Sequence, residues 1–130
     1  MKKASLGAIL ALCCMWCVTA MAADLTSANE SAIHAALTSG KPTVADFGAR
    51  TCIPCKKMAP ILESLSGEYR GKANVLFIDV HEDQAAAKKF HVLMIPTQIF
   101  FDAKGREVKR HIGFMEKKDV VKELKALGVR

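Results

Sequence analysis

The chain alternates between short apolar runs, which predict strands, and stretches with apolar residues every three or four positions, which predict helices. Strands are expected at 43–48, 75–80 and 97–102, and at 107–112 as the hairpin partner of the third. Helices are expected from the capping-box sequence at 27–30 to about residue 40, from the end of the first strand to about 69, at 83–90 and at 116–127. This order predicts an α/β fold, a three-layer α/β/α sandwich with a central mixed β-sheet.

Two of these segments carry more detail. The run from Val75 to Val80 is too uniformly apolar for a half-exposed strand, and we expect a central, parallel strand there. The last helix should turn four apolar residues inward, namely Val120, Val121, Leu124 and Leu127.

Residues 1–22 have the pattern of a secretory signal peptide. A basic start is followed by a nearly continuous apolar run from Leu6 to Val18 and by the small-x-small sequence Ala20-Met21-Ala22. We expect cleavage after Ala22, with Ala23 as the second choice, so that 130 residues less 22 leave one domain of 108 residues at 23–130. A retained membrane anchor is the alternative, but the apolar run is short for a spanning helix. The pattern therefore predicts a periplasmic or secreted protein.

Removal of the leader changes the cysteine and charge composition. Three of the five cysteines leave with it (Cys13, Cys14 and Cys17), and Cys52 and Cys55 remain. A disulfide across so short a loop removes little entropy from the unfolded chain. This favours a redox role for the two cysteines over a purely stabilising one.

Loss of Lys2 and Lys3 with the leader lowers the net charge from +6 to +4. The basic residues are spread among acidic ones, which is typical of a solvated surface and not of a nucleic-acid interface.

The segment Cys52-Ile53-Pro54-Cys55 joins the first strand to the second helix. A helix start presents unpaired N–H groups and the positive end of its dipole, which stabilise a thiolate at the first cysteine. The second cysteine lies one turn further on and can close a disulfide. An inert bridge or half a zinc site is the alternative, and zinc would need the dispersed histidines (His34, His81, His91 and His111) to converge. A c-type haem site is excluded because position 56 is Lys. We therefore expect a redox-active Cys52–Cys55 pair and no metal or other cofactor.

Further motifs surround this pair in the order of a known family. They are Val44-Ala45-Asp46-Phe47 before it, Lys56 and Met58-Ala59-Pro60 after it, Ile95-Pro96-Thr97 before the third strand, Lys104-Gly105 in the hairpin and Gly113 after the last strand. Over residues 25–128 the chain resembles the thioredoxin family, with the family's first strand short or missing because only residues 23–26 are available for it.

The chain also departs from cytoplasmic thioredoxins beside the cysteines. The family's usual tryptophans are replaced by Gly48 and Thr51, and the lysine near the buried aspartate by an apolar residue of the strand Val75–Phe77. Together with the leader, these departures resemble exported bacterial thioredoxin-like proteins.

The resemblance implies a role for each site residue. Cys52 attacks a substrate disulfide, and Cys55 resolves the mixed disulfide. Burial raises the pKa of Asp46, and the resemblance implies that it takes and returns the proton of Cys55. The alternative for Asp46 is a strand-end carboxylate satisfied by backbone N–H groups.

The resemblance also implies how substrates bind. A cis Ile95–Pro96 bond would pack against the cysteines and leave the Ile95 backbone free to pair with an extended substrate. Ile53 and Pro54 complete the substrate-binding residues. We expect a monomeric disulfide reductase acting on protein substrates and re-reduced by a membrane or periplasmic electron donor. A non-catalytic metal-binding or chaperone module and a dithiol oxidant are the alternatives.

Overall fold

A computed structural model describes residues 25–130. The predicted leader and its cleavage positions lie outside the described residues. Eight elements follow one another along the chain: α1 (Glu30–Leu37), β1 (Thr43–Gly48), α2 (Ile53–Glu68), β2 (Asn74–Asp79), α3 (Gln84–Lys89), β3 (Thr97–Phe101), β4 (Glu107–Ile112) and α4 (Lys117–Ala126). The sequence predicted all eight in this order.

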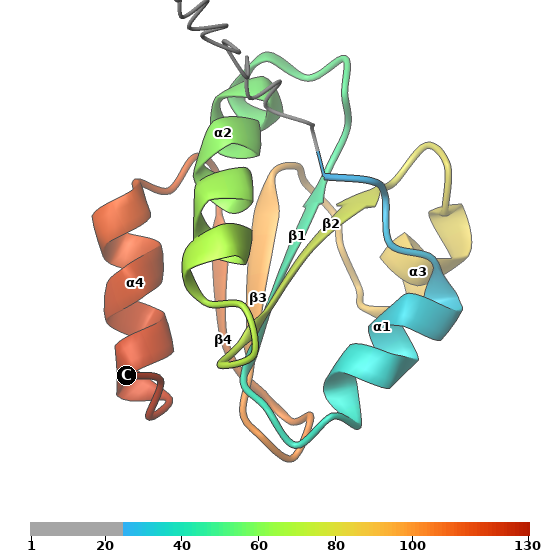
Figure 1. The fold of residues 1–130 in the computed structure, drawn as a ribbon. Helices are drawn as coiled ribbons and strands as arrows, with labels where there is room; N and C mark the ends of the chain where they lie inside the picture. The colour runs from blue at the N-terminus through green and yellow to red at the C-terminus, as the bar shows by residue number, and fades with distance from the viewer. Residues whose placement is uncertain (1–24) are drawn as a thin grey trace, which may run out of the picture.

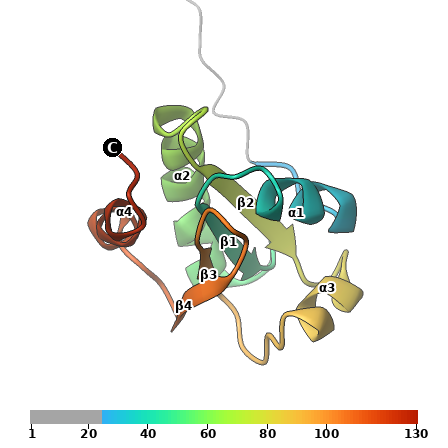
Figure 2. The ribbon, with the colours of Figure 1, turned by 90° about the horizontal axis from the view of Figure 1, so that it is seen from below.

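The elements form three layers around a four-stranded sheet with the strand order β2-β1-β3-β4. Strand β1 runs parallel to β2 and antiparallel to β3, and β4 pairs with β3 in an antiparallel hairpin. Helices α2 and α4 cover one face of the sheet, and α1 and α3 cover the other (Figures 1 and 2). The predicted α/β/α sandwich with a mixed sheet is confirmed.

The prediction of a central strand at 75–80 is wrong, because β2 lies at the edge of the sheet. Its outer side is covered by the segment before α1. Ser27 forms a single parallel bridge with Phe77, and the Ala28 N–H donates to the Phe77 carbonyl at 2.7 Å. The bridge is all that the described residues retain of the family's first strand. Helices cover both faces of β2, so its sequence is apolar although it has only one strand neighbour.

The start of α1 also differs from the capping box expected at Ser27. The N-cap is Asn29, whose side chain accepts the Ala32 N–H at 2.9 Å. The Ser27 hydroxyl instead accepts the Asp79 N–H of β2 at 2.9 Å. Ser27 therefore completes the hydrogen bonding of the β2 edge.

The strand side chains alternate between two apolar clusters. Val44 of β1 packs with Met58 and Leu62 of α2 and with Leu124 of α4. The opposite face of the sheet packs against α1 and α3, and its buried members are Ile33, Ala45, Phe47, Ile78, Ala86, Ile99 and Phe101. In α4, Val120 and Leu124 are buried as expected, while Val121 and Leu127 are partly buried.

Candidate redox site

The two cysteines lie where β1 ends and α2 begins. Cys52 is the N-cap of α2, and its sulfur accepts the backbone N–H of Cys55 at 3.4 Å. The two residues form a disulfide with their Cα atoms 5.2 Å apart. Cys52 is half-buried, whereas Cys55 is only 4% exposed. The sulfur nearer solvent is therefore also the one that receives a hydrogen bond from the helix terminus.

Asp79 holds the loop that precedes Cys52. Its carboxylate accepts the Arg50 N–H at 3.1 Å and the His81 N–H at 2.9 Å. Burial raises the pKa of Asp79, but these N–H donors outweigh burial and the pKa is lowered overall. The Arg50 guanidinium lies 5.1 Å from the centre of the Phe77 ring and donates to the Leu25 carbonyl at 2.9 Å. These bonds connect the loop to β2 and to the segment before α1.

Asp46 is fully buried in β1, on the face of the sheet that α2 covers. Its Oδ1 accepts a hydrogen bond from Nε2 of Gln98 at 2.7 Å, and no donor among the described residues reaches its Oδ2. Burial raises the pKa of Asp46 from 3.8 to about 7, and the Gln98 hydrogen bond opposes this rise. The only hydrogen bond described for the carboxyl therefore comes from a side-chain amide, not from backbone N–H groups.

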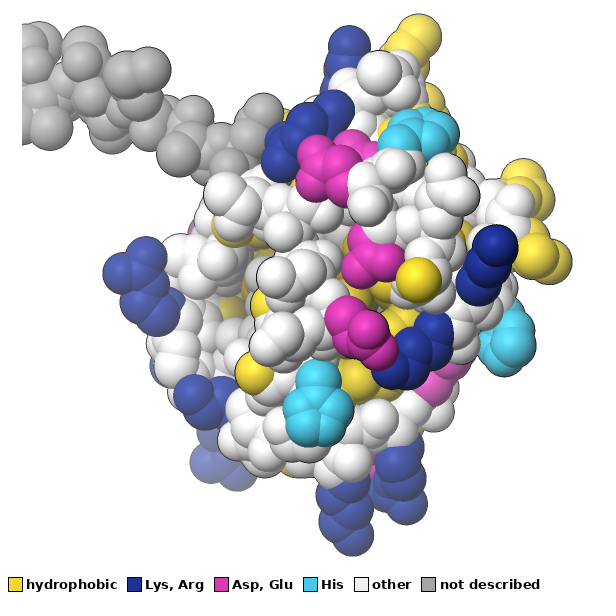
Figure 3. Space-filling view, turned by 90° about the vertical axis from the view of Figure 1, so that its right-hand side faces the viewer, with side chains coloured by type: hydrophobic (Ala, Val, Ile, Leu, Met, Phe, Trp, Pro, Cys, Tyr) yellow, Lys and Arg dark blue, Asp and Glu magenta, His cyan; other side chains and the backbone are white. Residues whose placement is uncertain are grey.

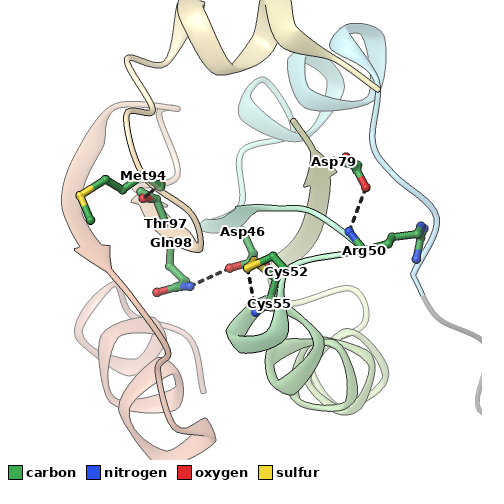
Figure 4. The surroundings of a disulfide bond; sticks show 8 residues. All are labelled: Asp46, Arg50, Cys52, Cys55, Asp79, Met94, Thr97 and Gln98. Atoms are coloured by element: carbon green, nitrogen blue, oxygen red, sulfur yellow. Dashed lines mark hydrogen bonds between the residues drawn. A yellow bond between two sulfur atoms is a disulfide. The ribbon is translucent and has the colours of Figure 1, made fainter. Parts of the chain in front are cut away.

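Gly48 shows how close this face of β1 comes to the buried sulfur. It lies two residues after Asp46 on the same strand face, and a Cβ placed on it would lie 3.3 Å from both Cβ and Sγ of Cys55. Figure 4 shows Asp46 between the disulfide and Gln98, with the amide nitrogen directed at the carboxyl. The β1 face that carries Asp46 thus lies directly beneath Cys55. A cavity of about 270 Å³, lined also by Lys56 and Phe77, opens beside Cys55.

The Ile95–Pro96 peptide bond is cis, as the family resemblance implied. Thr97 pairs with Phe47, which places Pro96 beside the end of β1. The Pro96 carbonyl accepts the Gly113 N–H at 2.8 Å, while no partner for the Ile95 backbone N–H or C=O is found among the described residues. Ile95 therefore presents an unpaired stretch of backbone next to the cysteines.

The loop that carries Ile95 is held by Arg110 of β4. Its guanidinium donates to the Phe90 carbonyl at 2.9 Å and to the His91 carbonyl at 3.1 Å. Glu107 binds the same guanidinium through two hydrogen bonds. The backbone before the cis-proline is thus anchored to the hairpin.

Several exposed apolar side chains lie at the same end of the molecule, whereas exposed Val108 lies near the β3–β4 turn. Ile53 is 72% exposed, Met94 62% and Leu93 94%, and Pro54 is exposed as well. Ile112 and Phe114 flank Gly113, which binds Pro96, and both are exposed. On the face over α1 and α3, charged side chains of both signs are spread across the surface, with apolar side chains visible between them (Figure 3). The sequence did not identify Leu93, Met94, Ile112 or Phe114.

No group of three or more metal-ligating side chains is found within residues 25–130. The structure instead brings four groups to one end of the sheet. They are the half-buried sulfur of Cys52, the buried sulfur of Cys55, the carboxyl of Asp46 and the backbone of Ile95. The sequence patterns also missed Gln98, the hydrogen-bond partner of Asp46. The only signal for it was a polar residue inside the apolar run that forms β3.

A disulfide at a helix N-terminus, beside a cis-proline loop on a mixed sheet, is the arrangement of a thiol–disulfide oxidoreductase. The family model described as thioredoxin matches residues 24–126, and the chain belongs to the thioredoxin family. The thioredoxin of Staphylococcus saprophyticus is 48% identical over 58% of this chain and 71% of its own length. That of Staphylococcus epidermidis is 39% identical over 77% of this chain and 94% of its own length.

Solved structures agree on the fold. A point mutant of the thioredoxin of Halobacterium salinarum superposes with a TM-score of 0.70 at 27% identity, covering 79% of this chain and 88% of that one. Chloroplastic thioredoxin z gives the same TM-score of 0.70 at 23% identity, over 82% of this chain and 96% of its own, and shows the fold alone.

The prediction of a periplasmic or secreted protein is contradicted by these comparisons, because the relatives are staphylococcal thioredoxins, which are cytoplasmic proteins. Gly48 and Thr51 are therefore not marks of export. They change the surroundings of the disulfide, and such changes carry no information about the compartment. Within the described residues no helix is long and apolar enough to cross a membrane.

The family also fixes the class of activity. The protein is a thioredoxin-family disulfide oxidoreductase with a Cys52–Cys55 pair. Proteins of this family act on protein disulfides through their own disulfide and need no cofactor. The expected enzyme class is confirmed.

Proposed function

We propose that this protein reduces disulfides in protein substrates, with Cys52 as the attacking thiol and Cys55 as the resolving thiol. The observation that carries the proposal is the contrast between the two sulfurs. Cys52 receives a helix N-terminal N–H and is partly open to solvent, whereas Cys55 is 4% exposed and one turn behind it. A nucleophile must reach its substrate, and a resolving thiol must reach only the nucleophile.

The cycle begins with the reduced pair. The Cys52 thiolate attacks one sulfur of the substrate disulfide, forms a mixed disulfide and displaces the first substrate thiolate. Cys55 then loses its proton and attacks the Cys52 sulfur, which forms the Cys52–Cys55 disulfide and releases the second substrate thiolate. The substrate gains two electrons and the protein loses two, which an electron donor must replace in the next cycle.

Asp46 serves as the acceptor of the Cys55 proton and later returns it. Three observations support this role: the carboxyl lies on the β1 face beneath Cys55, its Oδ2 has no donor among the described residues, and burial raises its pKa to about 7. A carboxyl with a pKa near 7 accepts a proton from a thiol far better than one at 3.8. Asp46→Asn should slow substrate reduction at neutral pH by about a hundredfold.

Substrate binding falls to the apolar end of the molecule. An extended substrate segment pairs with the free backbone of Ile95 beside Pro96, as an added strand. Ile53 and Pro54, exposed on the first turn of α2, contact the side chains that flank the substrate cysteine.

Cysteine variants test the two roles. Cys52→Ser should abolish reduction of insulin by dithiothreitol, since no thiolate attacks the substrate. Cys55→Ser should attack normally but accumulate a mixed disulfide, visible as a mass increase that a reductant reverses. Lys104→Ala, in the β3–β4 turn, is the control and should keep full activity. Mixed disulfides trapped by Cys52→Ser in place of Cys55→Ser would reverse the assignment.

The direction of transfer follows from the reduction potential. Equilibration with glutathione buffers should give a value near the thioredoxin potential of about −270 mV. A value near about −120 mV, that of a disulfide oxidase, would make the protein an oxidant. Alkylation of the free thiols followed by mass measurement gives the reduced fraction at each buffer ratio.

A further inference from the structure

Gln98 is a buried polar residue for which the packing of the sheet offers no reason. It is fully buried in β3, directly opposite Asp46 in β1. Its Oε1 has no hydrogen-bond partner among the described residues. A buried acceptor without a partner destabilises a fold, and an apolar side chain of similar volume would avoid this cost. Stability alone therefore does not account for an amide here.

The amide is directed at one oxygen of the carboxyl. Nε2 donates to Oδ1 of Asp46 at 2.7 Å, and Oδ2 has no donor among the described residues (Figure 4). When the carboxyl is protonated, the proton is favoured on Oδ2, because Oδ1 accepts an N–H and the carbonyl oxygen of a carboxylic acid is the better acceptor. Oδ2 is thus the oxygen that can give or take a proton.

We propose that Gln98 is the positioning residue for proton transfer: its amide holds Asp46 through Oδ1 and leaves Oδ2 to exchange the proton of Cys55. The inference rests on the proposed role of Asp46 and adds the residue that orients it. It also places a neutral amide from β3 beside the buried carboxyl, whereas the sequence indicated only that an apolar residue of the strand Val75–Phe77 replaces the family's lysine.

Other titratable groups on the surrounding elements do not offer the same contact. On α2, Cys55 lies over β1 with Cys52 at the N-cap, while Lys56 and Lys57 are exposed. Asp79 at the end of β2 is held by backbone N–H groups, and β3 carries no titratable side chain. On β4, His111 pairs with Gln98, and its ring contacts the Phe114 carbonyl at 3.2 Å, with no hydrogen bond to Asp46. The carboxyl is thus governed by burial first and by the Gln98 amide second.

The amide should favour the ionised form of Asp46, since a donor stabilises a carboxylate more than a carboxylic acid. Its removal should therefore raise the pKa of Asp46 further. A hydrogen bond to a charged group is strong enough to move the midpoint by about one pH unit. The fraction of Asp46 able to accept a proton at about pH 6 would then fall about tenfold.

The test compares three variants with the unmodified protein. Gln98→Met removes the donor at similar volume, Asp46→Asn removes the proton acceptor, and Ile99→Val alters the next residue of β3 on the opposite face. The midpoint of Asp46 is read from its carboxyl carbon by NMR, and the rate of single-turnover substrate reduction is measured from about pH 5 to about pH 9.

Gln98→Met should move the NMR midpoint and the rate profile upward together by about one unit, while Ile99→Val leaves both in place. In the Asp46→Asn background the Gln98 change should no longer move the rate profile. An unmoved midpoint in Gln98→Met overturns the positioning role, even where Asp46→Asn is slow and the proposed proton transfer stands. A normal rate profile in Asp46→Asn overturns the proton role itself, and the positioning role with it.

The unmodified protein supplies a measurement that does not depend on the folding of any variant. The side-chain amide protons of Gln98 should shift with pH at the same midpoint as the Asp46 carboxyl carbon. Amide resonances that stay constant through that midpoint would contradict the contact and overturn the proposal.

Discussion

The two faces of β1 and β3 are built from adjacent residues but differ in chemistry. On the face toward α1 and α3, Phe47 and Ile99 are buried in an apolar cluster. The fully buried polar side chains of β1 and β3 on this face are the hydroxyls of Thr43 and Thr97, and each donates to a backbone carbonyl. On the face toward α2, Asp46 and Gln98 are as deeply buried and form a polar pair with two unpaired oxygens. The strands do not need this pair in order to pack, since the other face packs with no unpaired buried polar atom among the described residues.

Within residues 25–130, the unpaired polar atoms of the core are confined to one place on this sheet face, at Asp46 and Gln98. The polar pair lies at the end of the sheet, beneath the disulfide, and the same α2-covered face is apolar again at Val44 and Phe100. A single buried pair of residues is thus polar, as the proposed proton transfer requires, while the rest of this face stabilises the fold through apolar contacts. Perturbing the two faces should therefore give different dependences on pH.

The largest effect is expected from Asp46→Asn, measured by urea unfolding as a function of pH. The folded protein keeps a proton on Asp46 up to about pH 7, whereas the unfolded chain loses it near 3.8. Between these values the folded state binds more protons, so this residue's contribution to stability is complete below about pH 3.8 and is lost as the pH rises to about 7. Over this window the free energy of unfolding of the unmodified protein should fall by about 4 kcal/mol relative to Asp46→Asn. Two parallel stability curves would contradict the raised pKa.

Much of this arrangement could be predicted from the chain. The strands and helices followed from the apolar spacing because each has its own period. Cys52 and Cys55 are neighbours in a short motif, and Asp46 is a charge within an apolar strand, so both were visible without tertiary information.

What depends on pairing between distant segments could not be predicted. Gln98 lies 52 residues from Asp46, and only the β1–β3 register brings them together. A one-residue slip would have turned Gln98 to the other face, and apolar runs do not fix register that closely. The edge position of β2 was missed for a related reason. The uniformly apolar sequence of β2 indicates that helices cover both of its faces. It does not indicate how many strands pair with it.

A smaller effect is expected from Gly48→Ala, on the same face as Asp46. The new methyl group would lie 3.3 Å from Sγ of Cys55 and from the Phe77 ring, which is shorter than an ordinary van der Waals contact. Overpacking should lower the free energy of unfolding of the oxidised protein by about 1–2 kcal/mol. The reduced protein should lose less, because a free Cys55 side chain can shift. Calorimetry of both forms measures the difference, and equal losses would show that the disulfide does not restrict this sulfur.

The smallest effect is expected from Ile99→Val, which removes one methyl group from the apolar face. The loss should be about 1 kcal/mol, the usual cost of this truncation in a packed core. It should be the same at about pH 4 as at about pH 8, since neither Ile99 nor its buried neighbours Phe47 and Ala45 titrate. Urea unfolding at the two pH values measures it under the conditions used for Asp46→Asn. A loss that grew with pH would mean that the faces are coupled through β3 and that proton chemistry is not confined to the α2 side.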